Sequence, residues 1–151
     1  FPTRRSSDLT IFNKYPVRYR DYTLRELCQE MHSLYVSFDV KDLQKAMFRQ
    51  ESLPAVAMNP QDANSAFIRG DVELVRICDA AGRIAAEGAL PYPPGVLCVV
   101  PGEVWGGAVQ RYFLALEEGI NLLPGFSPEL QGVYSETDAD GIKRLYGYVL
   151  K

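Results

Sequence analysis

Residues 90–103 constrain the fold more strongly than any other stretch of this sequence. Four prolines and two glycines fall within fourteen residues, around the apolar run 96–100. Proline fixes φ, lacks an N–H donor and pushes the preceding residue toward extended geometry. The stretch therefore predicts a rigid loop, a short buried strand and a sharp turn.

Rigid loops of this kind often shape a binding site or an interface. An aromatic residue lies near one end of the stretch and an acid at the other, which makes it a candidate for such a role. The alternative is a stiff corner that only packs. The candidate loop residues are Tyr92, Pro93, Pro94, Gly95 and Glu103.

The composition predicts one globular domain. The chain has 151 residues, of which 47% are hydrophobic, and its formal net charge is −3. An acidic chain lacks the basic patch that nucleic-acid binding requires, so we expect no nucleic-acid partner. No run of 18 apolar residues occurs, so we expect no membrane span. Three scattered cysteines, Cys28, Cys78 and Cys98, indicate buried thiols in the cytoplasm, not disulfides or a zinc site.

The first nine residues need separate treatment. Residues 1–9 read FPTRRSSDL, which looks like the translation of a common sequencing adapter, and no Met precedes them. We therefore expect an artefact outside the fold, with more protein upstream; a natural polar leader is the alternative. Residues 10–22 show no clear periodicity and are expected to form an extended lead-in, so that the domain covers 23–151.

Helices are predicted where caps and apolar spacing agree. Thr23 and Glu26 form a capping box before an amphipathic helix over 24–37, and Asp39 is expected to cap a second helix. Asn59-Pro60 marks a third helix start. A fourth helix buries one face, made by Val109, Tyr112, Phe113 and Leu116.

Short strands complete the prediction. Residues 72–77 and 83–89 are expected to pair across a turn, and residues 130–137 and 143–150 to form a hairpin. Helices and strands do not alternate regularly. The sequence therefore predicts an α+β fold, an irregular mix of helices and short antiparallel strands in a single domain.

No catalytic set is visible in the sequence. The sequence contains no G-x-S-x-G nucleophile elbow, no HExxH motif, and no Cys and His placed as a catalytic pair. The single histidine, His32, is expected to be structural. The acidic pairs Glu117-Glu118 and Asp138/Asp140 are expected to be solvated charge. We expect no catalytic, cofactor-binding or metal-binding residue.

Several motifs nevertheless carry a family resemblance. They resemble the C-terminal domain of the bacterial ornithine/lysine/arginine decarboxylases, over essentially residues 15–151. The segments are SFDV (37–40), KAMFRQE (45–51), GRIAAE (82–87), LPYPPGV (90–96), VPGE (100–103), FSPELQGVY (126–134) and YGYVL (146–150). Leu97 and Cys98 lie where the lysine and arginine enzymes tend to place a proline, so the sequence looks most like the biosynthetic ornithine enzyme.

The resemblance implies a fold-type-I pyridoxal-phosphate decarboxylase that converts L-ornithine to putrescine and CO2 in polyamine biosynthesis. The cofactor is the electron sink, while the protein supplies orientation and electrostatics. In the family the cofactor lysine follows a histidine in an upstream domain, and no lysine here follows a histidine. This fragment alone is therefore expected to bind no pyridoxal phosphate and to be inactive.

The resemblance also implies partners. The domain should pack on the upstream pyridoxal-phosphate domain within a homodimer or higher homo-oligomer, and help to shape the channel for a small-molecule substrate. Glu103 and Glu129 are candidates for steering a cationic substrate. The alternatives are helix capping or first-turn charge for Glu103 and ordinary solvation for Glu129. A free-standing, non-catalytic binding or assembly module is the competing reading of the chain.

Overall fold

The computed structural model describes residues 10–151, so the prediction about residues 1–9 lies outside the described part. Helices and short antiparallel strands are mixed in one small domain, which confirms the predicted α+β class. The helices are α1 (Thr10–Lys14), α2 (Pro16–Tyr19), α3 (Leu24–Ser37), α4 (Val40–Ala46), α5 (Pro60–Arg69) and α6 (Gly107–Leu122), with short 3₁₀ turns at Gln50–Ser52 and Ile77–Asp79. The strands are β1 (Val72–Arg76), β2 (Leu90–Tyr92), β3 (Glu129–Gln131), β4 (Tyr134–Thr137) and β5 (Lys143–Leu150).

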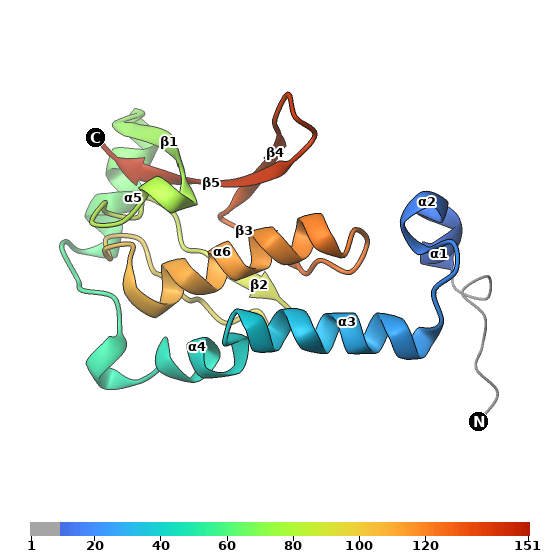
Figure 1. Cartoon of the computed structure of the whole chain (residues 1–151). Helices are drawn as coiled ribbons and strands as arrows, with labels where there is room; N and C mark the ends of the chain where they lie inside the picture. The colour runs from blue at the N-terminus through green and yellow to red at the C-terminus, as the bar shows by residue number, and fades with distance from the viewer. Residues whose placement is uncertain (1–9) are drawn as a thin grey trace.

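The strands form two small antiparallel sheets. One has the order β1-β5-β4 and the other pairs β2 with β3. Helix α6 lies between the larger sheet and the α3–α4 pair, and it contacts both α4 and β5 (Figure 1). The two-stranded β2–β3 sheet lies beside α6 (Figure 1), and its strand β2 begins the proline-rich stretch.

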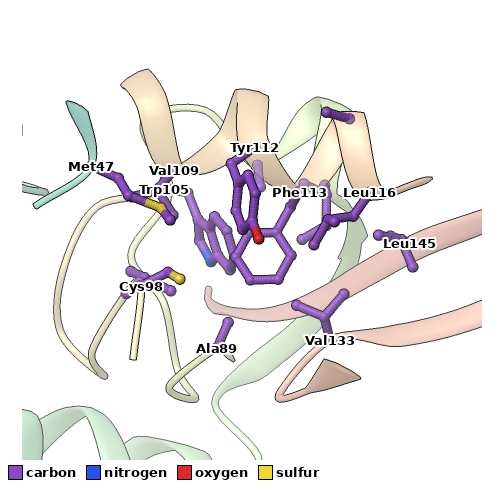
Figure 2. Packing of buried hydrophobic residues seen from close by; sticks show 14 of the residues in the cluster. Met47, Ala89, Cys98, Trp105, Val109, Tyr112, Phe113, Leu116, Val133 and Leu145 are labelled. Carbon is purple, nitrogen blue, oxygen red and sulfur yellow. The ribbon is translucent and has the colours of Figure 1, made fainter. Parts of the chain in front are cut away.

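The core forms around the buried face of α6. Its residues Val109, Tyr112, Phe113 and Leu116 are all buried, as their spacing predicted (Figure 2). Trp105 packs against Phe113 edge to face, with ring centroids 5.5 Å apart. Paired aromatic rings contribute beyond their buried area, so this contact is a strong link between α6 and the chain before it.

The predicted caps of α3 and α5 are confirmed, whereas Asp39, expected to cap α4, makes no side-chain cap hydrogen bond. The side-chain oxygen of Thr23 accepts a hydrogen bond from the Glu26 backbone N–H, and the Glu26 carboxylate accepts one from Thr23 N–H. This capping box starts α3 at Leu24. Asn59 caps α5 through Gln61 N–H, and Gly70 closes that helix in a left-handed conformation.

The expected extended lead-in over 10–22 is wrong. Two short helices, α1 and α2, occupy it. Tyr19, fully buried, packs edge to face on Phe12, Tyr22 and Phe126. Helices this short are not stable alone, so tertiary contacts of the aromatic side chains hold them and periodicity could not reveal them.

Two strand predictions are also wrong. Residues 83–89 make only isolated bridges, because β1 pairs instead with β5, far along the chain near its last described residue. Residues 96–100 form no strand: Val96 and Leu97 are exposed, and only Cys98 and Val99 enter the core. The hairpin prediction is correct for β4 and β5, but Leu130 pairs with β2.

Two statements about buried groups need correction. Cys28 and Cys78 are exposed, and only Cys98 is buried as predicted. Glu117, expected in solvent, is buried and accepts a hydrogen bond from Leu145 N–H. The Arg144 guanidinium lies 3.8 Å from the Glu117 carboxylate, so Glu117 fastens the β4–β5 hairpin to α6, while Asp138 accepts a hydrogen bond from Arg144 within the hairpin.

Candidate functional site

The proline-rich stretch projects as an exposed arm. Residues 92–97 are all exposed, whereas Pro91 and Cys98 on either side are buried. Gly95, with φ of 76°, donates its N–H to the Pro91 carbonyl and turns the chain back. We call residues 91–97 the proline arm. The chain is buried at Pro91 and again at Cys98, directly after the arm, while residues 92–97 face outward.

The structure brings two of the predicted site residues together at the end of the arm. In the β2–β3 pairing, Tyr92 lies directly opposite Glu129. Both are exposed, and Glu129 accepts a hydrogen bond from the Gln131 side chain at 3.2 Å. We call Tyr92 and Glu129 the tip pair. An aromatic face beside a carboxylate is a combination that attracts alkylammonium groups.

A close backbone contact holds the other end of this two-stranded sheet. Gly132 has φ of 71°, and a Cβ placed there would lie 2.0 Å from the Gly88 carbonyl oxygen. Next to it, the Tyr134 hydroxyl donates a hydrogen bond to the Glu87 carboxylate at 2.9 Å. The tip pair is therefore positioned by a junction that only glycine permits.

Glu103 lies away from the tip pair and has a local role. Its carboxylate accepts a hydrogen bond from Val100 N–H at 2.8 Å, across the turn that ends the proline-rich stretch. This is a turn contact and not the helix capping considered from the sequence, because α6 begins only at Gly107. Of the two acids, only Glu129 therefore lies exposed beside Tyr92.

Two hollows lie between the proline arm and the helices. The outer one, of about 460 Å³, is lined by Tyr35, Lys41 and Pro93 among others. The inner one, of about 230 Å³, lies among Phe48, Pro94, Val96 and the buried thiol of Cys98. Burial raises the pKa of the Cys98 thiol to about 11, so the thiol is protonated and inert at neutral pH.

The lysines within residues 10–151 all lie at the surface: Lys14, Lys41, Lys45, Lys143 and Lys151 are exposed. A Schiff-base lysine works in a desolvated pocket, which none of these side chains occupies. Within residues 10–151 no group of three or more His, Cys, Asp or Glu side chains is arranged to hold a metal ion. His32 is exposed on α3.

No helix among residues 10–151 combines the length and the apolar character needed to cross a bilayer.

Comparison with known proteins decides the family. The sequence model described as "Orn/Lys/Arg decarboxylase, C-terminal domain" matches residues 41–151. This chain belongs to the Orn/Lys/Arg decarboxylase C-terminal domain family. The match includes the proline arm, the tip pair and the close contact at Gly132, so the site described above lies within the family domain.

Relatives of the family domain are similar over most of this chain. The constitutive ornithine decarboxylase of Escherichia coli K12 is 89% identical over 94% of the chain, which covers 20% of that protein. The lysine decarboxylase of Hafnia alvei is 33% identical over 84% of the chain and 17% of that protein. The chain thus spans about a fifth of the length of its curated relatives.

Solved structures confirm the fold of the family domain. The structure of E. coli constitutive lysine decarboxylase superimposes with a TM-score of 0.77 and 31% identity, over 93% of this chain and 19% of that one. Lysine decarboxylase A from Pseudomonas aeruginosa gives a TM-score of 0.78 at 32% identity, over 89% of this chain and 18% of that one. The exposed arm and its neighbouring helices are therefore part of a fold shared by much larger proteins.

Sequence reasoning found the arm but missed what positions it. The Glu87–Tyr134 pair and buried Glu117 were not singled out as structural contacts. One signal was present for the Glu87–Tyr134 pair: Gly88 follows Glu87 and Gly132 lies two residues before Tyr134, and glycines outside helices often mark close backbone approach.

Proposed function

We propose that this chain serves as the C-terminal domain of a pyridoxal-phosphate-dependent ornithine decarboxylase, which converts L-ornithine to putrescine and CO2. The observation that carries the proposal is the contrast in identity among relatives. Curated ornithine decarboxylases from E. coli and Haemophilus influenzae are 62–89% identical to the chain, whereas curated lysine decarboxylases are 32–35% identical. The free thiols Cys28, Cys78 and Cys98 are compatible with a reducing compartment, and we place the protein in the cytoplasm.

The cofactor belongs, in this proposal, to residues upstream of the domain. Pyridoxal phosphate supplies the electron sink for decarboxylation, and it needs a desolvated lysine. Because every lysine in residues 10–151 is exposed, the groups present here do not fit the cofactor. The domain's contribution is therefore shape and charge at the substrate entrance, within a homodimer or larger homo-oligomer.

The tip pair is the part of the domain we assign to the entrance. Tyr92 is 55% exposed and Glu129 is exposed opposite it, at the end of a two-stranded sheet whose other end is fixed. Ornithine carries two ammonium groups and one carboxylate at neutral pH. A carboxylate beside an aromatic face attracts its side-chain ammonium, while the rigid arm keeps that face in place.

A chimera tests the proposal. The matching C-terminal segment of E. coli constitutive ornithine decarboxylase is replaced by residues 10–151 of this chain, and CO2 release is measured with ornithine, lysine and arginine. The unaltered E. coli enzyme is the control. We expect a chimera that decarboxylates ornithine at a rate close to the control and strongly prefers it. A folded, cofactor-loaded chimera without ornithine activity, or one that prefers lysine, would contradict the proposal.

A further inference from the structure

The two hollows beside the proline arm share two lining residues. Gln44 and Tyr112 line both, and the Gln44 amide donates a hydrogen bond to the Tyr112 hydroxyl at 3.2 Å. Pro93 lines the outer hollow and Pro94 the inner one. We call the two hollows together the α4 groove. Its lining comes from α3, from α4 and the residues just after it, from the proline arm and from α6.

Large apolar side chains stand half-exposed along the α4 groove. Tyr35, Phe48 and Val96 are 46%, 50% and 49% exposed, and each lines one of the two hollows. Water in such a concave apolar space is easily displaced by an apolar group, and exposed apolar patches of this kind mark interaction surfaces. The groove is therefore shaped to receive an apolar side chain.

One charge in the α4 groove lacks a partner. Lys41 is exposed at the outer hollow and forms no ion pair within residues 10–151. By contrast Lys45, one turn further along α4, lies 3.9 Å from Asp42. An acidic group on whatever fills the groove would complement Lys41.

We propose that the α4 groove binds a segment of the upstream domain of the same decarboxylase, with an apolar side chain between Phe48 and Val96 and an acidic side chain opposite Lys41. This rests on the proposed function. If the proposed function holds, most of the protein lies outside this chain, because the curated relatives are about five times as long as the matched segment. Pro93, which lines the outer hollow, directly follows Tyr92 of the tip pair in the chain. Seating the segment there would set the position of the arm.

A photocrosslinking experiment on the chimera tests the groove. Phe48 is replaced by p-benzoylphenylalanine, the chimera is irradiated, and the crosslinked peptides are identified by mass spectrometry. Ile68 on α5, which is 76% exposed and lines neither hollow, receives the same replacement as the matched control. We expect position 48 to crosslink to residues of the upstream domain at a yield severalfold above position 68.

Other crosslinks would overturn the assignment. A crosslink from position 48 only to the C-terminal domain of another copy would make the groove an interface between copies of this domain. No crosslink above the position 68 level would leave the groove without a polypeptide occupant. In either case the groove proposal fails, even where the chimera decarboxylates ornithine. An inactive chimera that still crosslinks to the upstream domain contradicts the ornithine assignment and leaves the groove proposal standing.

A second pair of variants checks the charge. Lys41→Glu in the chimera is expected to reduce the crosslink from position 48 severalfold, because it places two like charges together. Lys45→Glu is the control and is expected to leave the yield unchanged, since Lys45 already pairs with Asp42. Equal yields from the two charge variants would refute an acidic group opposite Lys41.

Discussion

Gly132→Ala is the substitution expected to damage the positioning of the tip pair most. Gly132 has φ of 71°, in the left-handed region, where a Cβ costs about 1–2 kcal/mol. The new Cβ would also lie 2.0 Å from the Gly88 carbonyl oxygen and 3.3 Å from Ala89 Cα. These are backbone atoms, so a strand must move, at a further cost of about 1–3 kcal/mol. The expected loss of unfolding free energy is about 2–5 kcal/mol.

Gly141→Ala is the control that separates the cost of the left-handed backbone from the cost of the steric clash. Gly141 has φ of 80°, but a Cβ there would meet nothing within 4 Å, so only the left-handed cost of about 1–2 kcal/mol applies. For a chain of this size, 1 kcal/mol corresponds to about 2–4 °C in Tm. Thermal unfolding by circular dichroism should therefore show a drop of about 10 °C for Gly132→Ala and about half of that or less for Gly141→Ala. Equal drops in the two variants would refute the close contact as the constraint on the arm.

Three further predictions concern caps, buried charge and pH. Thr23→Ala removes the capping box and should cost about 1 kcal/mol in urea unfolding; an unchanged midpoint would rule out that contribution. Glu117→Ala leaves the Leu145 N–H without its buried acceptor and should cost about 2 kcal/mol, whereas Glu117→Gln should cost less because its amide oxygen still accepts; equal costs would contradict the hydrogen-bond account. Burial, helped by the hydrogen bond to Glu87, raises the pKa of Tyr134 to about 12. In the unfolded chain a tyrosine has a pKa of about 10. The stability gained by keeping Tyr134 neutral in the folded protein is therefore complete below that pH, and it is lost as the pH rises toward 12. Between pH 9 and pH 11.5 the Tm of Tyr134→Phe should therefore fall less than the Tm of the parent. Equal falls in Tm would contradict the raised pKa of Tyr134.

Local signals in the sequence were sufficient where neighbouring residues decide the structure. The start of α3 follows from Thr23 and Glu26, and the start of α5 from Asn59, because each cap bonds a backbone N–H two or three positions away. The face of α6 follows from spacing alone, since the same residues must point into one core.

Contacts between distant residues were not visible in the sequence. Tyr19 holds α2 through rings as far away as Phe126, and β1 takes β5 as its partner across most of the domain. No local pattern encodes such pairings. Glu117 illustrates the same limit: a carboxylate in an acidic pair normally faces water, and only the fold places Leu145 N–H and Arg144 around it.

The sequence predicted only part of the candidate site, because the rest depends on contacts between residues that are distant in the chain. Proline and glycine marked the arm, but the sequence did not show that Tyr92 and Glu129 meet across two strands or that Glu103 serves a turn. The close Gly88–Gly132 contact beside this sheet likewise joins residues far apart in the chain.

We propose that the tip pair forms part of the entrance for a cationic substrate, and the ionic-strength dependence of kcat/KM tests this placement most directly. In the chimera, Glu129→Gln removes one carboxylate from the tip pair, while Glu118→Gln removes an exposed carboxylate on α6 as the control. At low salt we expect Glu129→Gln to lower kcat/KM for ornithine about twofold with kcat unchanged, because one charge acting through water over several ångströms contributes about 0.5 kcal/mol. The difference should vanish at about 1 M salt, where screening is strong. A kcat/KM that stays at the parent value at low salt, or falls equally in both variants, would contradict the placement of the tip pair at the entrance.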